Sequence, residues 1–131
     1  MANEVAAIIE LLGNGGDPIR YTCATAIPKG TLLKITTPRT VAAQTTADTP
    51  IAGIAAMETD GTETSISVYT NGIFDMYSAA GFAVGVSVAA ETVSANGVIA
   101  SDANDWLRGS TVGQALETAG AGGIGAVRVL K

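Results

Sequence analysis

The sequence has no histidine and only one cysteine, Cys23, among its 131 residues. Without histidine, the Ser-His-Asp and Cys-His nucleophile arrangements and most transition-metal sites are excluded. Cys23 has no basic residue next to it that would activate its thiol, so we expect it to be a small core residue. We therefore predict no catalytic residues, no cofactor and no metal, and we expect that the protein is not an enzyme.

Charged residues and aromatics are also scarce, at 15% and 5% of the chain. A net charge of −5 with seven basic residues gives no clustered positive face for nucleic acid or for an anionic membrane surface. No apolar run reaches the roughly 18 residues of a membrane-spanning helix, and the N-terminus lacks the basic start of a signal peptide. We expect synthesis in the cytoplasm, with neither nucleic acid nor membrane as partner. Because hydrophobic residues reach 47%, the chain predicts more apolar surface than a monomer exposes, hence an oligomer or a docking protein.

Turn signals recur every 8–12 residues or so after residue 17, with short alternating or apolar runs between them. Ile51–Met57 is apolar almost throughout and predicts a buried strand. The pattern indicates an all-β class, with residues 17–131 as a single β-domain.

The N-terminal segment, residues 1–16, has a different pattern. Val5, Ile8, Ile9 and Leu12 recur at the spacing of one helical face. The segment is therefore predicted to be a short helix, either packed on its own domain or serving as an arm that orders on a partner. A helix of this length is marginal alone in water and needs a docking surface.

Two stretches of the β-domain read as related units, about residues 28–76 and 83–131. Gly53 corresponds to Gly113, and an upstream glycine, Gly30, corresponds to Gly85. Further matches align Glu58-Thr59 with Glu117-Thr118, and Ile66 and Val68 with Val127 and Val129. A repeat built from strands and turns indicates architecture and carries no catalytic signal.

Three other features are candidates for chemistry or for a contact. Asp102 and Asp105 suit an acid/base pair or a cation, but the rest of a calcium loop is absent, so a solvated turn is favoured. The glycine-rich stretch 120–125 has neither the helix start nor the lysine of a phosphate loop. Trp106, in a predicted polar loop, is either an anchor of that loop or a contact residue at an interface.

The motifs IPKGTLLKI, IAGIAA, VYTNGIFDM and VGQALETA…VRVLK occur in this order along residues 17–131. In that order they resemble the capsid decoration (head-stabilising) proteins of tailed phages and related archaeal viruses, which include the lambda-type decoration protein. The resemblance implies a compact β-tulip or β-barrel-like domain. It also implies homotrimers on the exterior of the expanded capsid, which bind the major capsid protein and stabilise the shell against internal DNA pressure.

The N-terminus departs from the lambda-type pattern, because that family often uses an extended arm where this chain predicts a helix. We expect the capsid or inter-subunit contacts to come from Val5, Ile8, Ile9 and Leu12, together with Trp106. The alternative is a virion-displayed carbohydrate-binding or host-adhesion module, for which Trp106 beside Asp105 is the candidate aromatic platform.

Overall fold

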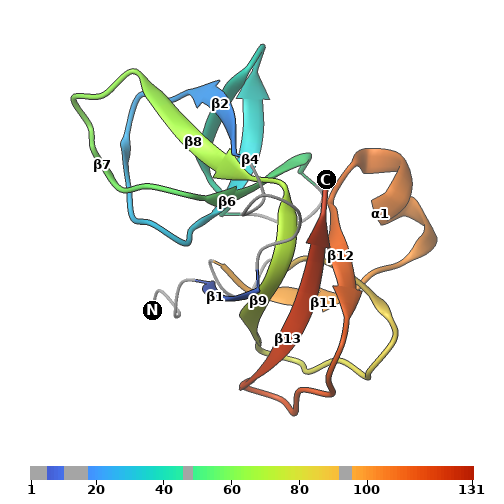
Figure 1. Ribbon diagram of the computed structural model, residues 1–131. Coiled ribbons are helices and arrows are strands. Elements are labelled where there is room, and N and C mark those ends of the chain that lie inside the picture. Colours follow the sequence, from blue (N-terminus) through green and yellow to red (C-terminus); the bar gives the residue numbers. More distant parts are fainter. Residues whose placement is uncertain (1–5, 11–17, 46–48, 92–95) are drawn as a thin grey trace.

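The computed structural model describes residues 6–10, 18–45, 49–91 and 96–131. Its upper part in Figure 1 is a closed five-stranded barrel with the strand order β2-β5-β4-β6-β8. The bounds of these strands are β2 (Ile19–Thr22), β4 (Leu32–Thr37), β5 (Thr40–Ala43), β6 (Ile51–Ala55) and β8 (Ser65–Tyr69).

The lower part is a six-stranded sheet with the order β1-β9-β13-β12-β10-β11. Its strands are β1 (Ala7–Glu10), β9 (Asn71–Ser78), β10 (Ser87–Ala90), β11 (Val98–Ala100), β12 (Thr111–Ala115) and β13 (Gly123–Leu130). The remaining elements are the paired strands β3 (Ala26–Ile27) and β7 (Thr59–Asp60), and the helix α1 (Ala103–Arg108). The predicted all-β class is confirmed. In the described part of the chain, no helix has the length and hydropathy needed to cross a bilayer.

The predicted N-terminal helix is wrong where the structure describes the segment. Ala7–Glu10 forms β1, which pairs antiparallel with β9, and Ala6 N donates to Gly30 O at 2.8 Å. Two adjacent β-branched residues, Ile8 and Ile9, favour a strand, and β9 offers a row of backbone groups that a helix would leave unpaired. The helical spacing of a short apolar stretch is weaker than this pairing. Val5 and Leu12 lie outside the described residues.

The barrel and the sheet repeat one pattern of strand pairing, which defines unit one (residues 19–69) and unit two (residues 71–130). In unit one, β4 pairs with β6 at Leu33 and Gly53, and the register then shifts. In unit two, β10 pairs with β12 at Val88 and Gly113, and the register shifts at the same place. The predicted match of Gly53 with Gly113 therefore places two glycines at equivalent positions of equivalent strand pairs.

The hydrogen bonds beside these glycines are also equivalent. Gly30 N donates to Ala55 O at 2.9 Å in unit one, and Gly85 N donates to Ala115 O at 2.8 Å in unit two. The antiparallel β3–β7 pair of unit one has as its counterpart the single antiparallel bridge between Phe82 and Ala119 in unit two. The correspondence therefore extends beyond the main strands.

A parallel contact closes each unit. The pair Thr22–Thr40 joins β2 to β5 in unit one, and the bridge Tyr77–Gly97 brings β9 to the start of β11 in unit two. Each barrel strand thus has a counterpart, with β2, β4, β5, β6 and β8 corresponding to β9, β10, β11, β12 and β13. The repeat starts at β2 and β9, which lie earlier than the predicted starts near residues 28 and 83.

The predicted alignment of the last strands is off by two residues. Ala55 pairs with Val68 in unit one and Ala115 pairs with Val127 in unit two, so Val68 corresponds to Val127. By the same pairing, Glu58-Thr59 is shifted by one from Glu117-Thr118. Alternate residues of a strand look alike in sequence because side chains repeat with period two, so a two-residue slip leaves the apolar pattern intact.

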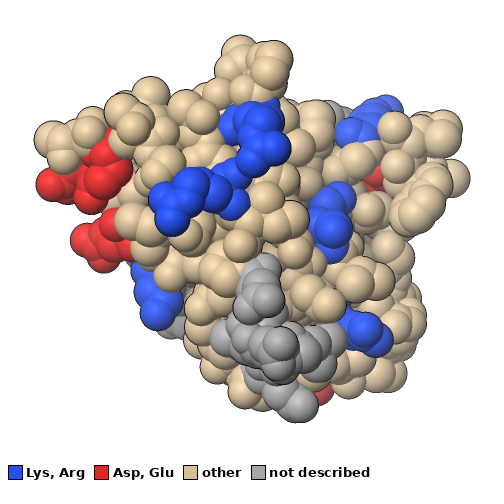
Figure 2. Space-filling model, turned by 45° about the horizontal axis from the view of Figure 1, so that its top comes forward, with Lys and Arg blue, Asp and Glu red and all other residues tan. Residues whose placement is uncertain are grey.

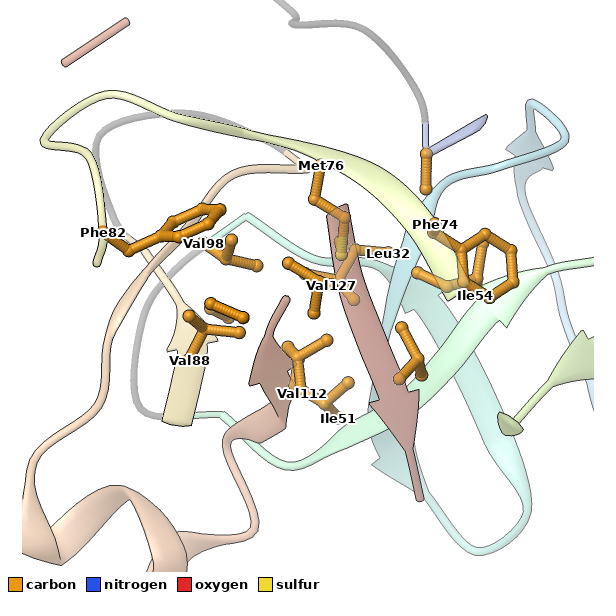
Figure 3. Packing of buried hydrophobic residues seen from close by; sticks show 14 of the residues in the cluster. Leu32, Ile51, Ile54, Phe74, Met76, Phe82, Val88, Val98, Val112 and Val127 are labelled. Carbon is orange, nitrogen blue, oxygen red and sulfur yellow. The ribbon is translucent and has the colours of Figure 1, made fainter. Parts of the chain in front are cut away.

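A central core joins the two units (Figure 3). Leu32, Ile51 and Ile54 of unit one belong to the same buried cluster as Phe74 and Val127 of unit two. A second cluster fills the barrel of unit one and consists of Cys23, Ile27, Leu33, Val41, Ala52, Ala55, Ile66 and Val68. Strand β6 contributes to both clusters and is buried at every position, as its apolar sequence predicts. Cys23 is buried as predicted, and its Sγ lies 3.6 Å from Glu63 O.

Polar contacts fix the orientation of the two units. Leu32 N donates to Asn96 Oδ1 at 2.9 Å, and Gln44 Nε2 donates to Glu91 O at 3.2 Å. Tyr69 and Phe74, on either side of the junction, have ring centroids 5.9 Å apart. Burial of apolar surface holds the two units together but does not depend on direction, so these hydrogen bonds and the ring contact set their relative orientation.

The equivalent glycines allow a stability test. An alanine methyl at Gly113 would overlap the carbonyl group of Arg128 on β13, so we expect Gly113→Ala to lower the free energy of unfolding by about 1–3 kcal/mol. The control is Gly120→Ala, where the added methyl meets open space, and a change below about 0.5 kcal/mol is expected. Urea denaturation measures both values, and equal stability of the two variants would contradict the close approach of β12 and β13.

Glu91 makes stability depend on pH. Its side chain is buried, its Oε1 accepts a hydrogen bond from Ala79 N at 3.0 Å, and its Oε2 has no partner among the described residues. Burial raises the pKa of the Glu91 carboxyl above its ordinary value of 4.5, because the charged form is desolvated. The protonated Glu91 carboxyl therefore makes its full contribution to the free energy of unfolding below about pH 4.5, and this contribution is lost as pH rises through the raised pKa.

We expect the free energy of unfolding to fall as pH rises above this value. Glu91→Gln keeps an acceptor for Ala79 N but cannot ionise. Its free energy of unfolding should therefore fall less steeply with pH than that of the unchanged protein, and the two slopes should differ by at most about 1.4 kcal/mol per pH unit. Urea denaturation of both proteins at a series of pH values from about 4.5 upward measures the difference between their slopes. Parallel pH profiles for the two proteins would show that Glu91 does not titrate in this way.

Candidate functional site

Helix α1 is positioned by reciprocal caps at its N-terminus. Asp102 Oδ1 accepts from Asn104 N at 2.9 Å and from Asp105 N at 3.0 Å, while Asp105 Oδ2 accepts from Asp102 N at 2.8 Å. Gly109 follows the helix with a φ of 73°, a left-handed conformation that glycine adopts without strain. A six-residue helix is too short to be stable by itself, so these caps and its docking contacts hold it in place.

The predicted loop and solvated turn at residues 101–109 are therefore wrong. Asp105 is buried, and its Oδ1 accepts from Ser110 Oγ at 2.9 Å and lies 3.8 Å from Arg108 Nη1. The two aspartates act as helix caps. The Asp-x-x-Asp spacing followed by glycine carries this signal in the sequence, although aspartate is a less common third-position partner than glutamate.

The C-terminal end of α1 is attached to both units. Gly109 O accepts from Ile51 N at 2.9 Å and from Lys131 Nζ at 3.1 Å, and Lys131 Nζ also donates to Thr111 O at 2.7 Å. A lysine ammonium at the last carbonyls of a helix is favourable because these carbonyls carry partial negative charge. The helix is thereby fixed with Trp106 75% exposed and Leu107 81% exposed.

Beside α1, three paired residues form a polar row across unit two. Arg128 on β13 pairs with Gln114 on β12, and Gln114 pairs with Ser87 on β10. All three side chains are exposed. Gln114 Nε2 donates to Gly85 O at 3.1 Å, which leaves its amide oxygen available as an acceptor.

The counterpart of the polar row in unit one is apolar and largely buried. Leu32 pairs with Ile54, and Ile54 pairs with Tyr69, at the positions equivalent to Ser87, Gln114 and Arg128. These three residues pack in or against the central core. The same face is thus covered by protein in unit one and open in unit two.

The α1 groove is the hollow between Trp106 and the polar row. Its volume is about 220 Å³, and Thr111 and Leu130 complete its lining with the backbone at Gly113. Sequence reasoning identified Trp106 but missed the polar row, because only the strand register brings Ser87, Gln114 and Arg128 side by side.

Strand β1 also exposes apolar side chains. Ile8 is 41% exposed and Ile9 is 51% exposed, on a strand whose only described pairing is with β9. Figure 1 shows β1 and α1 on opposite sides of the sheet, so the predicted contact residues Ile8 and Ile9 are not brought together with Trp106.

The glycine-rich turn at 120–125 uses its amides internally. Gly122 N donates to Ser78 O at 2.9 Å, and Gly123 N donates to Gly120 O at 2.9 Å, so these donors do not form an anion cradle. Among the described residues, no group of three or more aspartate, glutamate or cysteine side chains could hold a metal ion.

The molecular surface in Figure 2 is mostly uncharged. On this face, lysine and arginine side chains lie in separate groups among uncharged residues, and the acidic side chains gather mainly at one side. Among the described residues, lysine and arginine form one ion pair, between Arg108 Nη1 and Asp105 Oδ1 at 3.8 Å. The face therefore offers uncharged contact area between isolated charges.

No protein-family model matches the chain, and no curated protein matches its sequence. Among solved structures, the chain is similar to the N base of the head fiber gp8.5 of bacteriophage phi29, with a TM-score of 0.56 and 13% sequence identity. The similarity covers 86% of this chain and 92% of that chain. At this level of identity, the comparison establishes a shared fold.

The caps of α1 allow a local test. Asp102→Ala removes the acceptor for two helix amides and should destabilise α1 by about 1 kcal/mol. We expect faster hydrogen exchange at Asn104 and Asp105, with the amides of β13 unchanged. Asp102→Ser keeps a capping oxygen and should restore slow exchange. If Asp102→Ala leaves the α1 amides protected, the capping box is not what holds the helix.

Proposed function

We propose that the chain is a structural protein of a virion that binds the exterior of the expanded capsid as homotrimers. In this proposal it contacts the major capsid protein and stabilises the shell against the pressure of packaged DNA. The supporting observation is the fold shared with a phage head-fiber base over nearly the whole of both chains. The protein acts through contact area, has no enzymatic activity and requires no cofactor.

The surface of β1 suits a protein partner. Among the described residues it is the edge strand of the sheet, paired only with β9, and it presents the β-branched Ile8 and Ile9 to solvent. An exposed edge with apolar side chains is a template for another chain, which can add main-chain hydrogen bonds and bury the isoleucines. We assign capsid contact to β1, and the predicted contacts Val5 and Leu12 flank it in the sequence.

Many trimers on one shell would make modest individual contacts effective. Each additional docking point turns a further contact into an intramolecular event, so the total affinity of a trimer exceeds that of one chain. Stabilising a shell in this way requires repeated burial and symmetry, with no titrating group in a reactive position.

The test uses heads of the encoding virus from which this protein is absent, expanded and purified. The full chain should co-sediment with these heads, light scattering should give three times the mass of one chain, and decorated heads should keep their DNA under chelator and low salt. Ile8→Thr with Ile9→Thr removes apolar surface while preserving β-branching, and should lower head binding at least about 10-fold, or about 1.4 kcal/mol.

The matched control is Val84→Thr, which changes another exposed β-branched residue, 60% exposed and outside β1. It should bind heads like the unchanged protein. Failure of the unchanged protein to bind heads would overturn the proposed function. Full binding by the isoleucine variant would show that β1 is not the contact.

A further inference from the structure

We propose that the α1 groove binds a single pyranose ring of a glycan, with Trp106 as the stacking platform and the polar row as the hydrogen-bonding wall. This groove is separate from β1, so glycan binding is independent of the proposed capsid contact.

The two units differ in the chemistry of this face. Unit one uses this face to pack Leu32, Ile54 and Tyr69 at the central core, where apolar contact is what stabilises the fold. Unit two has arginine, glutamine and serine at the equivalent positions. An apolar partner on this polar face would bury its donors and acceptors without hydrogen bonds, which costs free energy. A hydroxyl-rich ligand would form hydrogen bonds with them.

Trp106 lies in a connection that is longer in unit two than in unit one. The connection from β5 to β6 spans seven residues (44–50), whereas the equivalent connection from β11 to β12 spans ten (101–110) and contains α1. The exposed tryptophan therefore lies on the additional piece of unit two, and capping and docking contacts hold it at the groove. An indole ring has an apolar face that packs on the C–H face of a pyranose and an N–H that stays hydrated.

The wall of the groove offers both hydrogen-bond donors and acceptors. The Arg128 guanidinium presents donors in a planar fork, and it has no ion-pair partner among the described residues. The Gln114 amide oxygen is an acceptor, and the Ser87 and Thr111 hydroxyls both donate and accept. Neighbouring sugar hydroxyls need this combination of donors and acceptors on one side, opposite a flat apolar surface.

The volume of the groove suits a single sugar ring. Drug-sized ligands occupy roughly 300–1,000 Å³, so a groove of about 220 Å³ holds a smaller group, such as one sugar ring. One ring with one stacking residue gives weak binding, with an expected Kd of about 1–10 mM, near −4 to −3 kcal/mol. Several copies displayed together would convert this into useful avidity for a glycan with repeated rings.

The chain offers a built-in reporter, since Trp106 is its one tryptophan. Titration of the full chain with glucose, galactose, mannose, N-acetylglucosamine and glucuronic acid should change the tryptophan emission saturably for at least one sugar. Sorbitol, a linear polyol, should give no saturable change. If none of the five sugars gives a saturable change, or if sorbitol gives the same change, the proposal is overturned.

Variants then locate the site by calorimetric titration with the sugar that binds. Trp106→Ala and Arg128→Ala should each weaken binding at least about 10-fold, a loss of about 1.4 kcal/mol. Leu107→Ala is the matched control, because Leu107 is the adjacent exposed apolar residue of α1 but does not line the groove, and its affinity should be unchanged. Far-UV circular dichroism checks that each variant is folded.

The two proposals fail separately. Trp106→Ala should still bind heads fully, since capsid contact is assigned to β1. Sugar binding that survives Trp106→Ala would overturn the groove as the site. Loss of head binding by Trp106→Ala, without sugar binding by the unchanged protein, would overturn the glycan proposal and assign Trp106 to a protein contact.

Discussion

The structure depends on burying the outer face of unit one against unit two. The barrel of unit one has its own interior, formed around Leu33, Ile66 and Val68, yet β4 and β6 also carry Leu32, Ile51 and Ile54 on the opposite face. Leaving such side chains in water would cost roughly 1.5–3 kcal/mol each. The two units are therefore parts of one packed molecule, and the polar contacts of Asn96 and Glu91 fix how they meet.

A repeated pairing pattern explains how one fold gives two different surfaces. Backbone pairing places residues of β4, β6 and β8 in the same geometry as residues of β10, β12 and β13. Backbone pairing does not determine which side chains occupy these positions, and the two units carry side chains of opposite polarity there. In unit one the face joins the units, whereas in unit two it is polar and accessible. The proposed glycan groove lies where the units differ, at the polar row and at α1, which is part of the longer connection of unit two.

Much of the architecture could be predicted from the sequence, because strand signals are local. Turn residues between short apolar runs indicate the all-β class, and the unbroken run Ile51–Ala55 indicates burial on both faces. The prediction for Ala7–Glu10 was wrong because an open edge on β9, far away in sequence, outweighs a helical spacing. The repeat was detected through its glycines, and its last strands were misaligned because a pattern of period two does not fix the register.

The candidate site was predictable only in part, since its residues come together through long-range pairing. Trp106 stands out as the one tryptophan of the chain, but its partners Gln114 and Arg128 are ordinary surface residues of a strand until the register is known. The decisive feature is rigidity. A tryptophan on a loose loop would lose backbone freedom on binding, whereas the backbone of the capped helix α1, which is bonded to Ile51 and Lys131, is already ordered. The free energy that holds α1 in place thus comes from folding, and a ligand that reaches Trp106 meets a surface that is already formed.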